Sequence, residues 1–368
     1  MRIAHRKGIR LKSYARRAPK RLSVLYDTPM ETASDSVRVV PTDHKEELSR
    51  LGILHLNNFW ARYSRNGRKN GENRDWVADN TLLSGLRLSI QETLAHLHST
   101  TPTLEQFEAW ILERNGGALD PERIRRLNVA LGGGSPDTAA VDDSGPLPLT
   151  GADLDFWNEN GYVVLHDAVS PEQCEAAAQA IYDFLGLDPG QPDTWYGHGI
   201  WVPLVHHPAF WANRESPRIH RAFAQLWGRK DLWVSVDQGG WNPPERAGWH
   251  FSGQGLHFDV SLEAPVPFGV QGILYLTDTA ANQGAFRCVP GFHRRIEAWL
   301  KSLPPGADPR REDLEKFGAV PIPGRAGDLI IWHQALPHAS SPNRATLPRV
   351  VQYIRMLPSQ WEYNPRWR

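Results

Sequence analysis

Two triplets of the form His-x-Asp/Glu could each supply two ligands to a metal ion, and they begin at His257 and His44. His257 and Asp259 lie in a β-like stretch, where side chains two positions apart point to the same side. His44 and Glu46 open a charged, helical stretch, where residues two apart do not share a face. The first pair can therefore converge on one ion, whereas the second pair is expected to be solvated surface.

A third ligand has two candidates further along the chain. His333 ends an apolar, strand-like run, and His338 follows five residues later in a loop rich in Pro, Ser and Ala. Two histidines and one carboxylate on one face of an ion leave three positions open, as in mononuclear non-haem Fe(II) oxygenases. His250 and His293 have no partner two residues away and are expected to be structural or to line a pocket.

The elements that must position these side chains lie mostly in residues 150–368. Short strand-like runs bounded by Gly and Pro follow one another there, without regular helices between them. This pattern favours a sandwich or jelly roll over a parallel α/β sheet. Two helices precede the strands: Thr150 opens one that ends at Gly161, and Ser170 caps another with Pro171 at its first position.

Residues 42–131 are predicted to be helical. Thr103 and Gln106 have the spacing of a capping box, and Asp120 with Pro121 is typical of a helix start. A helix near the beginning of this region is predicted from apolar residues that share one broad face: Leu48, Leu51, Ile53, Leu54, Leu56 and Phe59.

The chain is therefore expected to have four parts. Residues 1–41 form a basic, flexible arm, because the first 26 residues hold nine Lys or Arg and no acid; an organelle transit peptide is the alternative. Residues 42–131 form the helical region, and residues 132–149, rich in Gly, Pro, Ser and Asp, form a linker. Residues 150–368 form the β-rich domain.

Composition places the protein among soluble globular chains. It has 368 residues, 40% of them hydrophobic and 22% charged, with a formal net charge of zero. This balance gives no bias toward nucleic acid, and the lack of a long apolar run argues against a membrane span. Cys174 and Cys288 lack the spacing of a disulfide framework or a structural zinc site, which fits a cytoplasmic location.

Several ordered stretches resemble the phytanoyl-CoA dioxygenase-like branch of the Fe(II)/2-oxoglutarate oxygenases, over about residues 150–358. FWNENGYVVLHDAVS is similar to the family's opening helix and strand, and GLHFD to its first metal motif. NQGAFRCVPGFHRR resembles the stretch N-G-x-x-x-x-x-P-G-S-H, with Phe292 where Ser is usual. GDLIIWHQALPHASSPNRATLPR resembles the closing motif, in which the metal histidine follows the loop. The resemblance therefore selects His338 over His333.

The resemblance implies a site as well as a fold. His257, Asp259 and His338 would hold Fe(II) in a double-stranded β-helix (jelly roll). Arg349, eleven residues after the last ligand, would grip the distal carboxylate of 2-oxoglutarate, and the Ser340 hydroxyl would help to hold it. The charge and planar fork of an arginine suit a carboxylate, which agrees with this assignment.

The activity implied is oxidation by dioxygen with decarboxylation of 2-oxoglutarate to succinate. An unactivated C–H of a small-molecule or natural-product substrate would be hydroxylated, with desaturation or cyclisation left open. A halogenase is disfavoured because Asp259 is present. Two other classes remain: a cupin-like isomerase or hydrolase that uses its ion as a Lewis acid, and a silent scaffold. The first has no need of Arg349, and the second has no need of three converging ligands.

Further contacts are predicted from position alone. Gln271 and Tyr275 share one face of a strand-like run, and we assign Gln271 to the cosubstrate and Tyr275 to the substrate, with inner-face packing as the alternative for each. Trp241, Trp249 and Gln254 precede the metal motif and are candidate substrate contacts. The N-terminal helices are expected to wall the substrate pocket or to bind a partner such as a carrier protein that tethers the substrate.

Overall fold

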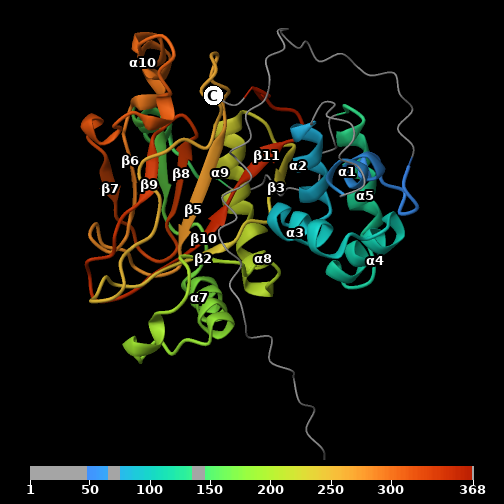
Figure 1. The fold of residues 1–368 in the computed structure, drawn as a ribbon, viewed down its shortest axis with the longest axis horizontal. Coiled ribbons are helices and arrows are strands. Elements are labelled where there is room, and N and C mark those ends of the chain that lie inside the picture. Colours follow the sequence, from blue (N-terminus) through green and yellow to red (C-terminus); the bar gives the residue numbers. More distant parts are fainter. Residues whose placement is uncertain (1–47, 65–74, 135–145, 367–368) are drawn as a thin grey trace, which may run out of the picture. The chain divides into compact units, whose positions relative to one another are not determined.

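The computed structural model of the protein describes residues 48–64, 75–134 and 146–366 (Figure 1). They belong to one compact unit of the chain. The predicted arm, the triplet that begins at His44 and residues 135–145 of the predicted linker lie outside the described residues. The division into domains therefore stays a prediction.

The described residues of the helical region form five helices, and the cap predictions at Thr103 and Asp120 are confirmed. Thr103 and Gln106 form the expected capping box, and the Asp120 side chain accepts a hydrogen bond from the Glu122 N–H. The helices pack around a core that includes Phe59 and Phe107. They are α1 (Leu56–Tyr63), α2 (Trp76–Gly85), α3 (Ile90–Thr100), α4 (Leu104–Arg114) and α5 (Pro121–Leu131).

The first helix is shorter than its apolar pattern predicts. Gly52 and His55 adopt left-handed backbone conformations, with φ of 71° and 65°, and these end any helix that would start earlier. Leu48 is accordingly 55% exposed instead of buried. The periodic pattern therefore holds only from Leu56 onward.

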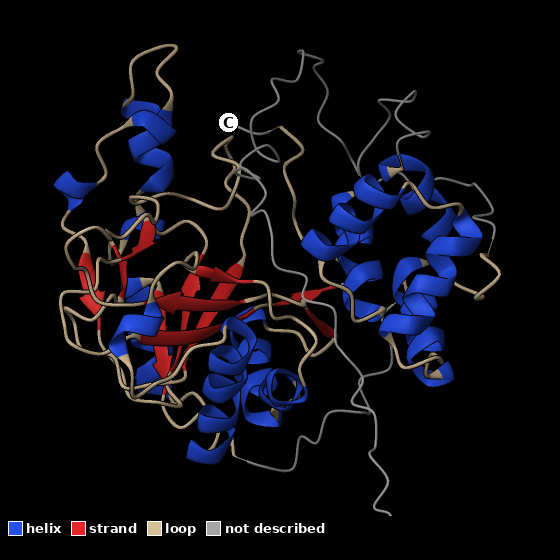
Figure 2. Cartoon of the chain, turned by 60° about the horizontal axis from the view of Figure 1, so that its bottom comes forward, coloured by secondary structure: helices blue, strands red, loops and turns tan. Residues whose placement is uncertain are grey.

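The rest of the described chain contains three antiparallel sheets together with further helices (Figure 2). The largest has the order β1-β8-β5-β10-β4-β2, the second β7-β6-β9 and the third β11-β3. The strands are β1 (Tyr162–Leu165), β2 (Trp201–Val202), β3 (Leu232–Val234), β4 (Gly239–Asn242), β5 (Val270–Tyr275), β6 (Phe286–Cys288), β7 (Val320–Ile322), β8 (Leu329–His333), β9 (His338–Ser340), β10 (Arg349–Ile354) and β11 (Met356–Pro358).

The six-stranded sheet is buried on both faces. Alternate residues of β5 point to opposite sides: Leu274 joins a core shared with helices α7 and α9, and Ile273 joins a core shared with the three-stranded sheet. The helices of this region are α6 (Gly151–Asn160), α7 (Pro171–Leu185), α8 (Pro208–Arg214), α9 (Pro217–Trp227) and α10 (Ile296–Ser302), with short 3-10 turns η1 (Pro192–Trp195), η2 (Phe292–Arg294), η3 (Pro309–Arg311) and η4 (Glu315–Phe317).

Two expectations for this region need correction. The strands do have regular helices among them, because α8 and α9 lie between β2 and β3. The signals for α9 were present, since Ser216 caps it, Pro217 opens it and Gly228 ends it. The described residues also place more residues in helices than in strands, so the chain mixes helices with antiparallel sheets and is not mainly β.

The helical region contacts the rest of the described chain at several places, among them the Glu92–His206 ion pair and a buried tryptophan of β3. Trp233 of β3 is 7% exposed and packs into the core of the N-terminal helices, beneath the guanidinium of Arg126. Cys174 and Cys288 are both free and buried, as expected from their spacing. Within the described ranges, no helix has the length and apolar content needed to cross a membrane.

Candidate metal centre and cosubstrate site

Backbone pairing brings His257 and His338 face to face. The N–H of each donates to the carbonyl of the other, at 3.1 Å in both directions. Residues that exchange both hydrogen bonds in an antiparallel pair lie directly opposite, with their side chains on one face. His338 therefore opens strand β9 and does not lie in a loop as expected, because it also pairs with Cys288 of β6.

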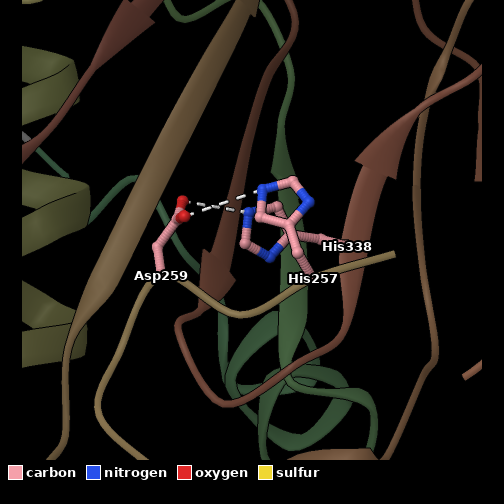
Figure 3. A group of neighbouring side chains, drawn as sticks. All are labelled: His257, Asp259 and His338. Atoms are coloured by element: carbon pink, nitrogen blue, oxygen red, sulfur yellow. Dashed lines mark hydrogen bonds and ion pairs between the residues drawn. The ribbon is translucent and has the colours of Figure 1, made fainter. Parts of the chain in front are cut away.

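The three predicted metal ligands converge (Figure 3). The Asp259 carboxylate lies 3.3 Å from Nε2 of His338 and 3.6 Å from Nε2 of His257. The three ligand atoms all lie within 4.8 Å of one another. Two atoms bound at right angles to one ion are about 3 Å apart when each bond is about 2.1 Å. The side chains can therefore hold one ion with only small movements.

Hydrogen bonds at the far side of each ring fix which nitrogen faces Asp259. Nδ1 of His257 bonds the Gly255 carbonyl at 2.9 Å, and Nδ1 of His338 bonds the Leu336 carbonyl at 3.0 Å. A carbonyl only accepts, so each Nδ1 donates to it and each Nε2 is left facing the carboxylate. There Nε2 can share a proton with Asp259 or, once that proton is lost, offer a lone pair to a metal ion. This donor set fits a divalent metal ion.

Electrostatics keep two of these groups in their metal-binding forms. Burial, together with the neighbouring His338, lowers the pKa of His257. Burial alone would raise the pKa of Asp259, but hydrogen bonds from His338 and Gln271 and the charges of both histidines outweigh it, so this pKa lies below its usual value. A neutral imidazole and an ionised carboxylate are the forms that bind metal at neutral pH.

Two side chains that hold Asp259 differ from what the sequence suggested. Gln271, predicted to contact the cosubstrate, donates from Nε2 to the Asp259 carboxylate at 2.9 Å. Arg310, which no sequence pattern indicated, donates to the carbonyls of Phe258 and Val260 at 2.8 and 2.6 Å. Its partners are main-chain atoms some fifty residues away, so no local signal could have revealed it.

Arg349 is a buried arginine for which the described part of the chain offers no counter-ion. It opens β10, is 1% exposed and donates from Nη1 to the Ser340 hydroxyl at 3.0 Å. Its buried Nε has no hydrogen-bond partner, and among the described residues no carboxylate lies within ion-pair distance. Because an unpaired buried charge is costly, the position calls for an anion.

The arginine lies at the same site as the predicted metal ligands. Ser340 follows His338 by two residues on β9, so their side chains share a face. The two positions are about 7 Å apart along the strand. A five-carbon dicarboxylate can bridge that gap, with one end at Arg349 and the other at the metal ligands.

Aromatic side chains wall the site on the side of His338. The rings of Phe286 and Trp332 lie 6.1 and 5.1 Å from that of His338, measured between centroids. Tyr275, a predicted substrate contact, is fully buried; its hydroxyl donates to the Ile322 carbonyl and accepts from the Phe286 N–H. Its hydrogen-bonding capacity is used within the core, which favours a packing role.

The other predicted substrate contacts are dispersed. Trp241 is fully buried in the core under the helices, on the sheet face opposite the site, with its indole N–H donated to the Trp195 carbonyl. The prediction for Trp241 is therefore corrected. Trp249 is partly exposed against Tyr196, and Gln254 is exposed. The structure does not bring these two onto the ligand group.

The remaining histidines do not compete as ligands. The ring of His333 packs edge-on against Phe268, and its Nδ1 accepts the Ala335 N–H at 3.0 Å. Burial, with the nearby His293, lowers the pKa of His333 to about 3. His250 is exposed. Neither His333 nor His250 lies in the group formed by His257, Asp259 and His338.

Comparison with known proteins gives one family. The family model described as phytanoyl-CoA dioxygenase (PhyH) matches residues 157–351, just over half of the chain. A Dictyostelium discoideum protein whose name provisionally assigns it to the phytanoyl-CoA dioxygenases is 22% identical over 269 residues, 58% of this chain and 77% of that protein. The Aspergillus versicolor protein "Ava biosynthesis cluster protein O" is 21% identical over 239 residues, 56% and 77% of the two chains.

A solved structure is also similar. The non-heme alpha ketoglutarate dependent carbocyclase SnoK from nogalamycin biosynthesis is 20% identical, with a TM-score of 0.44 over 60% of this chain and 90% of that one. Iron and 2-oxoglutarate, the cofactor and cosubstrate expected from the sequence, are supported by the family match together with the group of three ligands. The chain belongs to the phytanoyl-CoA dioxygenase family.

Proposed function

We propose that the protein is an Fe(II)/2-oxoglutarate-dependent dioxygenase that hydroxylates an unactivated C–H of a small-molecule or natural-product substrate. The observation that carries this proposal is Arg349, an arginine that is 1% exposed, has an unpartnered buried Nε and has no carboxylate partner among the described residues. An anionic cosubstrate at this position would supply the missing counter-ion.

The metal is assigned to His257, Asp259 and His338. Two histidines and one carboxylate leave open positions for a chelating cosubstrate and for dioxygen. Iron bound there supplies the oxidising chemistry, coupled to decarboxylation of 2-oxoglutarate to succinate. The protein contributes orientation, because both Nδ1 atoms are tied to main-chain carbonyls and the carboxylate is tied to Gln271.

Arg349 and Ser340 are assigned to the distal carboxylate of 2-oxoglutarate. The guanidinium has donors left after its bond to the hydroxyl, including the buried Nε. A cupin-like isomerase or hydrolase would need the metal but not this arginine, so the unpaired charge favours the oxygenase. The aromatic rings around His338 would exclude water from the oxidising centre.

The remaining parts of the proposal follow from the same site. The six- and three-stranded sheets, which face each other across one core, are assigned as the two halves of a double-stranded β-helix. The substrate, free or tethered to a carrier, would enter beside the metal, in a cytoplasmic protein. Hydroxylation is proposed over desaturation and cyclisation as the simplest outcome of C–H oxidation.

Succinate release tests the proposal directly. Protein loaded with Fe(II) without oxygen would be given 2-oxoglutarate and then oxygen, without added substrate. Slow succinate formation is expected in the wild type and should be lost in Asp259→Ala and Arg349→Gln. His250→Gln changes an exposed histidine outside the site and should keep the wild-type rate.

Binding separates this function from Lewis-acid chemistry. In calorimetry on metal-loaded protein, 2-oxoglutarate should bind the wild type and bind Arg349→Gln about 10- to 100-fold more weakly, because one charge-assisted bond contributes roughly 1.5–3 kcal/mol. Metal affinity should be equal in the two proteins. Equal 2-oxoglutarate affinity in both would contradict the assignment of Arg349 and leave the cupin-like alternative as the better account.

A further inference from the structure

The segment that carries Asp259 is not held by the sheet that carries the other two ligands. His257 is the last residue of this stretch to pair with β9. In the part of the chain that the structure describes, no backbone–backbone hydrogen bond involves residues 258–260. The carboxylate of the proposed metal site therefore stands on a main chain that needs another anchor.

Arg310 provides that anchor. Its Nη1 donates to the Phe258 carbonyl at 2.8 Å and its Nη2 to the Val260 carbonyl at 2.6 Å. These carbonyls belong to the residues immediately before and after Asp259. One planar guanidinium thus bonds the main chain on both sides of the ligand, a geometry that a lysine ammonium cannot reproduce.

The local fold fixes the main chain of Arg310. Arg310 lies in the 3-10 turn η3, which begins when the Asp308 side chain accepts the Arg310 N–H at 3.0 Å. Pro309, at the first position of the turn, is buried. The connection between β6 and β7, which contains η3, also contains α10. Trp299 of α10 packs against the Phe258 ring, with 5.9 Å between the ring centroids. Both contacts hold the stretch next to Asp259.

We infer that Arg310 is a positioning residue for the metal centre: by bridging the carbonyls of Phe258 and Val260 it fixes the direction of the Asp259 carboxylate toward His257 and His338. The inference rests on the proposed function, because it takes these three residues to be the metal ligands. Groups that orient metal ligands typically change metal affinity by 10- to 100-fold when they are removed.

The charge of Arg310 acts on the same residues. The guanidinium carries a positive charge, and it bonds the main chain on both sides of the negatively charged Asp259. Losing the guanidinium would therefore loosen the carboxylate and also change the electrostatic balance of the ligand group. Both effects should be visible in a bound metal ion.

Cobalt(II) is the probe, because its visible absorption reports the number and geometry of its ligands. Metal-free wild type, Arg310→Ala, Arg310→Lys and Arg311→Ala would be titrated with Co(II) by calorimetry and by absorption. Arg311 is the matched control, since its side chain is 88% exposed and only loosely paired with Asp308 at 3.7 Å.

Arg310→Ala should bind Co(II) at least tenfold more weakly, with an altered spectrum. Arg310→Lys keeps the charge but not the double bond to the main chain, and should recover only part of the affinity. Arg311→Ala should match the wild type. Circular dichroism of each metal-free variant checks the fold, and Arg310→Lys keeps the test valid if the alanine variant does not fold.

Two other results would overturn the inference, and they differ from each other. If both Arg310 variants bind Co(II) with wild-type affinity and spectrum, Arg310 does not position Asp259, whatever its effect on stability, and the proposed function is untouched. If the wild type itself binds no Co(II) under the same conditions, the metal site fails and the inference fails with it.

Discussion

Three histidines in the β region of this protein differ in their neighbours: His257 and His338 face a carboxylate, whereas His333 is packed among aromatic rings. These neighbours decide what each histidine can do. His257 and His338 have Nδ1 tied to a carbonyl and Nε2 directed at Asp259. His333, which the residues alone left open as a ligand, is enclosed by aromatic rings, including that of Phe268. A ring that is buried without an acidic partner stays neutral and contributes packing.

This burial of His333 gives the protein a sensitivity to acid. Its pKa is about 3 in the folded protein, against about 6.5 in an unfolded chain. Between those values the unfolded chain binds a proton that the folded chain does not, so the free energy of unfolding falls as the pH falls below about 6.5. From about pH 7.5 to about pH 5, His333 should remove roughly 2 kcal/mol of stability.

The variant His333→Gln tests this, because glutamine does not titrate and can still accept the Ala335 N–H. Urea unfolding at the two pH values should show a loss of stability that is smaller than in the wild type by about 2 kcal/mol. His250→Gln, which removes an exposed histidine, should keep the wild-type dependence. An unchanged pH dependence in His333→Gln would contradict the burial argument.

At the scale of the elements, the sequence predicted best where the signal is local. Helix caps such as Thr103 with Gln106, and Ser170 with Pro171, are where the residues indicated. β9 was missed because its three residues pair on both sides with distant parts of the chain, at Cys288 and at His257. β4 begins with two glycines, which strand propensity does not favour.

The glycines of β4 lie where a side chain has no room, since a Cβ at Gly240 would lie 2.6 Å from the Val351 side chain of β10. Gly272 of β5 is in the same position. A Cβ atom there would lie 2.7 Å from the Ile354 carbonyl oxygen of the paired strand β10. Main-chain oxygen in the centre of a sheet cannot move aside, so Gly272→Ala should lower the free energy of unfolding by about 1–3 kcal/mol. β10 begins at Arg349, so 2-oxoglutarate affinity should fall as well.

Gly199→Ala is the matched control, because no atom lies within 4 Å of its added Cβ. Chemical unfolding and 2-oxoglutarate calorimetry would be measured on both variants. Gly199→Ala should stay close to the wild type in each. A Gly272→Ala variant as stable as the wild type would show that β5 and β10 can separate without cost.

For the whole molecule, the family motifs predicted the ligand group, while the position of the helical region had no signal in the sequence. The metal motif at His257 and the closing motif at His338 converge as the resemblance implies. The packing of the helices on β3 depends on Trp233, a tryptophan that no periodic pattern separates from the many others in the chain. Among the described strands β3 pairs with β11 alone, and β11 follows β10 directly.

This chain of contacts predicts that the helical region and the site-bearing sheets unfold together. Trp233→Ala should lower the free energy of unfolding by about 3–5 kcal/mol, the usual cost of truncating a buried tryptophan. Thermal unfolding would be followed by far-ultraviolet circular dichroism, to which α1–α5 and α6–α10 contribute about equally, and by release of bound Co(II). The two transitions should coincide in the wild type and shift together in the variant. Trp201→Ala, at a tryptophan that is 53% exposed, should shift both far less. If about half of the helical dichroism of Trp233→Ala is lost while Co(II) stays bound, residues 42–131 fold as a separate domain and Trp233 is only a point of contact.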